Sequence, residues 1–259
     1  MLLFTLGSLV NDTMNDQRQE REHKFVFNDA DAAGFLSAFE GRLARIEYDA
    51  SRPEAWTRTT YLDTDEFTYL RSSATHTHRR LRVREYASAA PGGEPALSGL
   101  CYLELKENTG SYRSKVRCAA PAAEIAALLR GSIPAGPSWT VRTHAAWITL
   151  LKRIIEERPS PRVTTWYRRE TFAIPSGRVR LTVDRDISIC EPVEPGSGAR
   201  PPRTMEQLAA TIVEVKVQGP NPEWLTPILA ASTETHGFSK FHRAMESVAG
   251  KLAVRGGAR

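Results

Sequence analysis

The chain has 259 residues, with 35 Lys and Arg, 30 Asp and Glu, and a formal net charge of +5 at pH 7. Its content of 41% hydrophobic and 25% charged residues is ordinary for a soluble globular protein and allows a sizeable buried core. The basic excess favours an acidic partner but excludes a histone-like nucleic-acid binder, so the positions of the charges matter more than their sum.

The N-terminus and the cysteines bear on where the protein resides. Residues 1–10 are apolar, lack a basic residue and are too short to span a bilayer, so we predict a frayed tail over residues 1–19. No other stretch approaches the length of a membrane span. Cys101, Cys118 and Cys190 are far apart and form no CxxC pair, which argues against a disulfide framework or a structural zinc site. We therefore expect a soluble, cytoplasmic protein.

The first half of the chain alternates strand and helix patterns. A polar strand over residues 20–27 stops at Asn28, a good helix N-cap, and apolar residues at helical spacing then predict a helix over residues 30–46. Asn108, Thr109 and Gly110 have the composition of a hairpin turn. The strands predicted in this half after the helix span residues 57–63, 79–86, 100–107 and 111–118.

The second half adds four helices and three strands. The Pro-, Gly- and Arg-rich segment 191–203 is predicted to be a surface loop. Strands with irregularly inserted helices favour an α+β fold, a closed antiparallel β-barrel of about eight strands with flanking helices. We predict one domain over residues 20–253, followed by a tail over residues 254–259. The predicted helices span residues 122–130, 143–158, 223–231 and 240–253, and the strands span residues 163–172, 178–189 and 211–218.

Paired charges recur at period two along these strands, which places each pair on one face of its strand. Such faces could simply be solvated, but basic residues on strand after strand indicate a basic bore inside the barrel. For example, Arg82 and Arg84 share one face of their strand, whereas Leu81 and Val83 share the other. The charges that recur in this way are Glu20, Glu22, Lys24, Arg82, Arg84, Glu104, Lys106, Lys115, Arg117, Arg180, Asp184, Glu214 and Lys216.

A basic bore indicates a phosphate-rich ligand. Clustered Lys and Arg repel one another and need a polyanion to offset the cost of their burial. Arg matches phosphate oxygens with its planar fork, and bound phosphates call for a hard divalent cation held by carboxylates. We therefore predict a site for a triphosphate or polyphosphate with Mn²⁺ or Mg²⁺. The candidate metal ligands are Glu20, Glu22, Glu104 and Glu214.

Two histidines, His76 and His78, lie just before the strand predicted over residues 79–86. Histidines at this spacing could bind a metal, but their position favours a loop that leads into the strand. We assign them no function from the sequence.

Short segments in a fixed order resemble a known family. The first is EREHK at residues 20–24, with the pattern E-x-E-x-K. The others are YLDT at 61–64, LRVRE at 81–85, LELK at 103–106, SKVR at 114–117, YRRETF at 167–172, RLTVD at 180–184, VEVK at 213–216 and SKF at 239–241. In this order, over about residues 20–250, they resemble the triphosphate tunnel metalloenzyme (CYTH-like) superfamily. Within it the chain is most similar to the VTC domain, the polyphosphate polymerase module of the vacuolar transporter chaperone complex.

The resemblance implies an enzyme and a role for individual residues. The enzyme would be a polyphosphate polymerase that uses ATP and a divalent metal, held by Glu214 with help from Glu22. Secondary contacts to the substrate would come from Lys115, Arg117 and Lys216. The residues that would hold phosphates are Lys24, Arg82, Arg84, Lys106, Arg169, Arg180 and Lys240.

Two alternatives use the same bore. An inorganic triphosphatase would transfer the phosphoryl group to water. Bacterial VTC-like chains often carry Arg at the position of Glu20, and with Glu at this position the chain resembles the hydrolytic branch of the superfamily more. A non-catalytic module would only bind polyphosphate. Nucleic-acid binding is not expected, because the strands carry no RNP-like aromatic motif and the chain has no basic tail.

Overall fold

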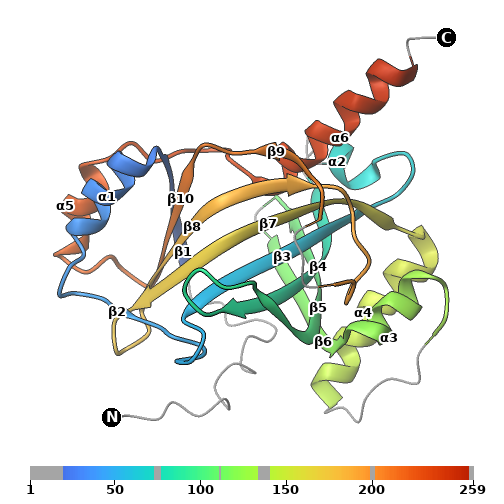
Figure 1. Ribbon diagram of the computed structural model, residues 1–259, viewed down its shortest axis with the longest axis horizontal. Coiled ribbons are helices and arrows are strands. Elements are labelled where there is room, and N and C mark those ends of the chain that lie inside the picture. The colour runs from blue at the N-terminus through green and yellow to red at the C-terminus, as the bar shows by residue number, and fades with distance from the viewer. Residues whose placement is uncertain (1–19, 73–76, 111, 134–140, 199–201, 257–259) are drawn as a thin grey trace.

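The computed structural model describes residues 20–72, 77–110, 112–133, 141–198 and 202–256, so the predicted tail over residues 1–19 lies outside the described residues. One antiparallel sheet runs through the whole domain, and helices flank it (Figure 1). Its strands are β1 (Glu20–Phe27), β2 (Ala44–Arg45), β3 (Glu54–Asp63), β4 (Thr77–Ala89), β5 (Ala96–Thr109), β6 (Tyr112–Pro121), β7 (Ser160–Ala173), β8 (Val179–Cys190), β9 (Thr204–Gln207) and β10 (Thr211–Gln218). The helices are α1 (Asp29–Ser37), α2 (Thr68–Ser72), α3 (Ala122–Leu129), α4 (Val141–Glu157), α5 (Leu225–Ala230) and α6 (Lys240–Gly256).

The sheet is open, and this corrects the prediction of a closed barrel of about eight strands. Its 10 strands follow the order β1-β10-β8-β7-β3-β4-β5-β6, with β2 beside β7 and β9 beside β8. The outer edge of β1 is covered by the segment before α6: Thr235 N donates to Lys24 O at 2.7 Å, and Val26 N donates to Thr235 Oγ1 at 3.3 Å. In the described part of the chain β1 and β6 do not pair, and the segment before α6 uses main-chain groups of Lys24 and Val26 at this edge.

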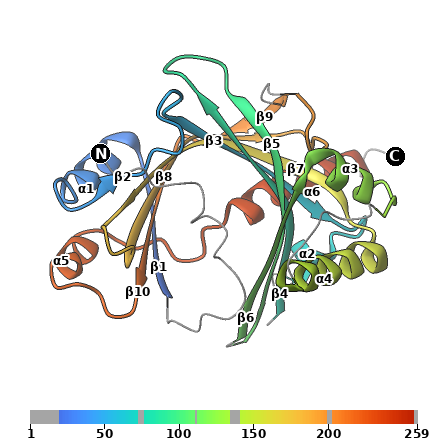
Figure 2. The same cartoon turned by 90° about the horizontal axis from the view of Figure 1, so that it is seen from below.

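The sheet nevertheless curves strongly. Figure 2 shows it as an arch, with α1 and α5 outside one limb and α3 and α4 outside the other. On both limbs an apolar face of the sheet points outwards to these helices. Val213 and Val215 of β10 pack with Phe35 of α1 on one limb, and Leu105 of β5 packs with Leu150 of α4 on the other. Much of the core therefore lies on the convex side, and the charged faces lie on the concave side, where Tyr61 also packs against Phe241 of α6.

Several predicted elements differ from those observed. Asn28 caps α1 as expected, accepting a hydrogen bond from Asp31 N at 2.8 Å, but α1 ends at Ser37 instead of residue 46. The chain then turns at Gly41, which has a φ of 69°, and forms the two-residue strand β2 beside β7. Strand β9 was not predicted either, because it has a short sequence without a clear strand pattern and is recognised by its pairing with β8. Within the described ranges, none of the helices combines the length and apolar character that a membrane crossing requires.

Candidate functional site

The concave face of the arch holds a cavity of about 160 Å³. A volume of this size holds on the order of ten water molecules, enough for several linked phosphates. Among the described residues, ten basic side chains but only two carboxylates, those of Glu22 and Glu214, line the cavity. The basic residues are Lys24, Arg80, Arg82, Arg84, Lys106, Lys115, Arg169, Arg180, Lys216 and Lys240.

The structure brings together most of the residues that the sequence singled out. All seven predicted phosphate-holding residues line the cavity, as do the predicted secondary contacts Lys115 and Lys216. Arg117 does not; its guanidinium stacks 3.7 Å from the centre of the Tyr102 ring. Glu20 and Glu104, two of the predicted metal ligands, also lie outside the lining. The chemical roles of all these residues stay predictions.

Other lining residues escaped the sequence analysis. Arg80 lies two residues before Arg82, and Tyr167 lies two residues before Arg169. This period-two spacing predicts the face of both residues, although neither was given a role. The remaining ones, which no charge pattern marks, are Tyr61, Thr182, Phe238, Ser239 and Phe241.

Strand register sets the order of the charges on the concave face. Arg80 of β4 lies opposite Lys106 of β5, and Arg82 lies opposite Glu104. The first pair consists of like charges, which repel each other when they lie directly opposite. The neighbouring pair Arg79 and Glu107 faces the convex side, where Arg79 Nε lies 3.0 Å from Glu107 Oε1.

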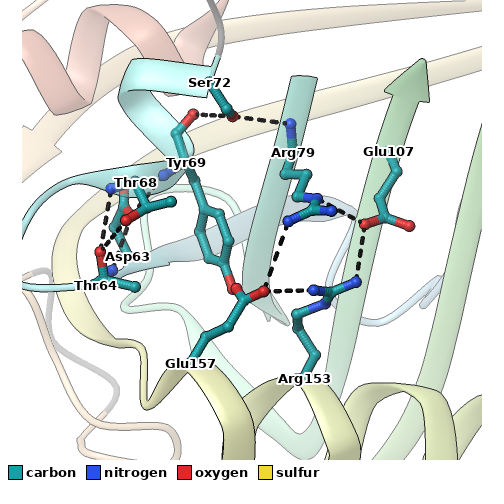
Figure 3. A network of polar contacts seen from close by, with 9 residues as sticks. All are labelled: Asp63, Thr64, Thr68, Tyr69, Ser72, Arg79, Glu107, Arg153 and Glu157. Carbon is teal, nitrogen blue, oxygen red and sulfur yellow. Dashed lines mark hydrogen bonds and ion pairs between the residues drawn. The ribbon is translucent and has the colours of Figure 1, made fainter. Parts of the chain in front are cut away.

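This convex-side pair belongs to a larger network that reaches α2 and α4 (Figure 3). Glu157, the last residue of α4, lies 3.6 Å from Arg79 and accepts a hydrogen bond from the buried hydroxyl of Tyr69. Arg153, one turn earlier in α4, contacts both Glu157 and Glu107. These ion pairs hold the ends of β4 and β5 together on the convex side. Arg80 and Lys106, which repel each other, lie next to them on the concave side.

Two buried carboxylates lie among the bases and anchor them. Asp184 of β8 is fully buried; Arg169 donates two hydrogen bonds to it, at 2.6 and 2.7 Å, and Lys240 Nζ donates another at 2.6 Å. Glu104, 1% exposed, accepts from Arg82 Nε at 2.6 Å. Burial alone would raise the pKa of each carboxyl, but Arg169 beside Asp184 and Arg82 beside Glu104 hold both pKa values well below their usual range. Both groups are therefore charged.

Other bases in the cavity have no such partner. Within the part of the chain that the structure describes, Arg80, Arg84, Lys106 and Arg180 form no ion pair with a carboxylate. Among the described residues, the one side-chain hydrogen bond of Arg84 is its bond of 3.3 Å to Thr59 Oγ1. The positive charge of Arg82, together with burial, lowers the pKa of Lys106 to about 7. A site with so many uncompensated bases attracts anions.

The two carboxylates of the lining lie diagonally across β1 and β10, because Glu22 pairs in register with Lys216 and Glu214 with Lys24. Burial opposes ionisation of Glu22, but Lys216 and Lys24 lower its pKa to about 2. Burial also opposes ionisation of Glu214, yet Lys240 helps to lower its pKa. Ionised carboxylates suit a hard cation, and Mg²⁺ commonly uses one or two of them plus ligand phosphates. The described residues contain no cluster of three or more His, Cys, Asp or Glu that could hold a metal without such help.

The lowered pKa of Lys106 predicts a pH dependence of stability. The folded protein loses the Lys106 proton near pH 7, whereas the unfolded chain keeps it until near pH 10.5. The unfolded state binds more protons in this window, so the contribution of Lys106 to the free energy of unfolding should rise with pH, by up to about 1.4 kcal/mol per pH unit. Urea unfolding measured across this window should show a flatter pH dependence for Lys106→Met than for wild type. If the free energies of unfolding of the two proteins changed in parallel with pH, a lowered pKa of Lys106 would be contradicted.

The comparisons agree with the fold and with the sequence motifs. The family model of the VTC domain matches residues 19–249. A putative adenylate cyclase from Bacillus halodurans has a similar structure, with a TM-score of 0.51 and 16% sequence identity over 86% of this chain and 96% of that chain. A protein from Pyrococcus horikoshii OT3 matches with a TM-score of 0.46 and 13% identity, over 88% of this chain and 98% of that chain. At such low identity the likeness concerns the fold alone, and none of the curated proteins matches this sequence.

Proposed function

Because this chain belongs to the VTC domain family, we propose that its cavity binds a triphosphate or polyphosphate and that it is a metal-dependent polyphosphate polymerase using ATP. The observation that carries this proposal is the imbalance of charge: in the described part of the chain, ten basic side chains and two carboxylates line one cavity. A linear polyanion would offset the repulsion among the bases along its whole length.

The cavity residues would divide the work of phosphoryl transfer. Arg84 and Arg180, which have no ion pair in the described part of the chain, would hold the transferred phosphoryl group and stabilise the charge that develops on it. Lys240 and Arg169, anchored by Asp184, would hold neighbouring phosphates in a fixed place. Glu214 and Glu22 would hold Mn²⁺ or Mg²⁺, which would neutralise phosphate charge.

The reaction itself needs no covalent intermediate with the protein. A terminal oxygen of a bound phosphate chain would attack the γ-phosphorus of ATP. The bond between this phosphorus and the β–γ bridging oxygen would break, so that ADP leaves and the chain grows by one phosphate. If water attacked instead, the same cavity would act as a triphosphatase.

Incubating the purified protein with ATP and Mn²⁺, and separating the products by gel electrophoresis, tests this function. We expect long polyphosphate and ADP to form together. ADP and free phosphate without long polyphosphate would establish a triphosphatase, and binding of tripolyphosphate without any product would establish a binding module. Absence of binding would refute the proposed function altogether.

The same assay tests the metal site with a Glu214→Gln variant. The amide keeps the size of the side chain but removes the charge that a hard cation requires, so the rate should fall at least tenfold and recover partly at high Mn²⁺. Glu223→Gln, a change outside the cavity lining, is the control and should keep the wild-type rate. Full activity of Glu214→Gln would remove this carboxylate from the mechanism.

A further inference from the structure

A cluster of two histidines and an arginine continues the basic surface beyond the cavity. His78 lies in β4, two residues before Arg80, and so on the same concave face as Arg80, Arg82 and Arg84. The sequence favoured a loop for His78, but the residue pairs in register with Asn108 of β5. His242 lies in α6, next to the cavity residue Phe241, whose ring centre is 5.6 Å from the guanidinium of Arg80.

Titratable groups of both β4 and α6 act on His242. Burial lowers the pKa of His242, and Arg80 and His78 lower it further. The carboxylate of Glu246, one turn later in α6, acts in the opposite direction. The contact of Arg80 with the ring of Phe241, the residue before His242, places β4 beside the first turn of α6 at this point.

Two nitrogens in this cluster lack a partner. His78 Nδ1 and His242 Nε2 are both buried from solvent and make no hydrogen bond to any described residue. Buried polar atoms are nearly always satisfied, so an unsatisfied pair in one place calls for a ligand or an ordered water. Arg80 likewise forms no ion pair within the described ranges. A guanidinium can only donate, and a neutral imidazole donates from whichever ring nitrogen carries its proton. One anion could therefore accept from Arg80 and from the tautomers with a proton on His78 Nδ1 and on His242 Nε2.

We propose that His78, Arg80 and His242 form a subsite for the phosphates of a chain that extends beyond the cavity. The proposal rests on the proposed function, since it requires a phosphate chain in the cavity itself. Arg80 is shared by both sites: it lines the cavity, and its guanidinium lies 5.6 Å from the ring centre of Phe241, the residue before His242. A chain held along Arg84, Arg82 and Arg80 therefore reaches His78 and His242 next. The subsite makes the protein favour long chains over tripolyphosphate.

The test is a comparison of two ligands in one titration series. Wild type and the double variant His78→Ala, His242→Ala are titrated calorimetrically with tripolyphosphate and with an inorganic polyphosphate several times longer. Losing two hydrogen bonds to an anion should lower affinity for the long chain about tenfold or more, while affinity for tripolyphosphate stays as in wild type. His144→Ala, at an exposed position of α4, is the matched control and should change neither.

Each outcome has a distinct meaning. Retained tripolyphosphate binding also shows that the double variant is folded. Equal losses for both ligands, or no loss for either, would overturn the subsite. If wild type bound tripolyphosphate but held the long chain no more tightly, the subsite would be refuted while the proposed function stood. If wild type bound neither ligand, the proposed function itself would fail.

Discussion

Replacing Arg84 by alanine is expected to lower the rate of ATP-dependent phosphoryl transfer by about 100- to 1000-fold, the usual effect of removing a donor that stabilises transition-state charge. Arg84 lines the cavity, and in the described residues its only side-chain partner is Thr59, 3.3 Å away. Its fork is therefore available to phosphate oxygens. Removing it should affect the transition state more than the bound substrate, so kcat should fall more than KM rises.

Two further variants sharpen this experiment. Arg84→Lys keeps the positive charge but loses the planar fork, so it should recover only part of the lost rate. Arg178→Ala removes an exposed arginine that is bonded to the carbonyls of Gln218 and Pro220, and it should leave the rate unchanged. A wild-type rate for Arg84→Ala would show that this side chain takes no part in the chemistry. If the protein only binds polyphosphate, the variant should instead weaken binding and reduce its salt dependence.

Replacing Asp184 by asparagine should lower the free energy of unfolding by about 3–5 kcal/mol, as expected when one partner of a buried ion pair is removed. Asp184 is fully buried and compensates the charges of both Arg169 and Lys240. Without it, these two bases add to the repulsion among the cavity residues. Urea denaturation of the ligand-free proteins measures the loss directly.

The control lies two residues further along the same strand. Asp186 pairs with Arg168 at 3.0 Å, but its side chain is 56% exposed, so Asp186→Asn should cost no more than about 1 kcal/mol. Its φ of 55° is also tolerated by asparagine, so the backbone need not change. Tripolyphosphate should raise the Tm of Asp184→Asn more than that of wild type, because the bound anion replaces part of the missing charge. Equal stability of the two variants would mean that Asp184 does not anchor the bases.

The alternation of charge and apolar residues along single strands is a local property, and the sequence by itself determined it correctly. Arg82 and Arg84 face one side of β4 while Leu81 and Val83 face the other, because successive side chains in a strand point in opposite directions. The same reasoning placed Lys106 and Glu214 at the cavity. The family followed from the order of such segments, and the match over residues 19–249 confirms it.

Only the tertiary structure decided which of these charges meet and which are already neutralised. Glu104 follows the same period-two pattern as Lys106, yet Arg82 and Arg117 enclose it and keep it out of the lining. The segment that bonds to the edge of β1 lies more than 200 residues further along the chain. Period-two patterns specify a face, but register, edge pairing and ion pairing arise between distant segments, and no local pattern encodes them.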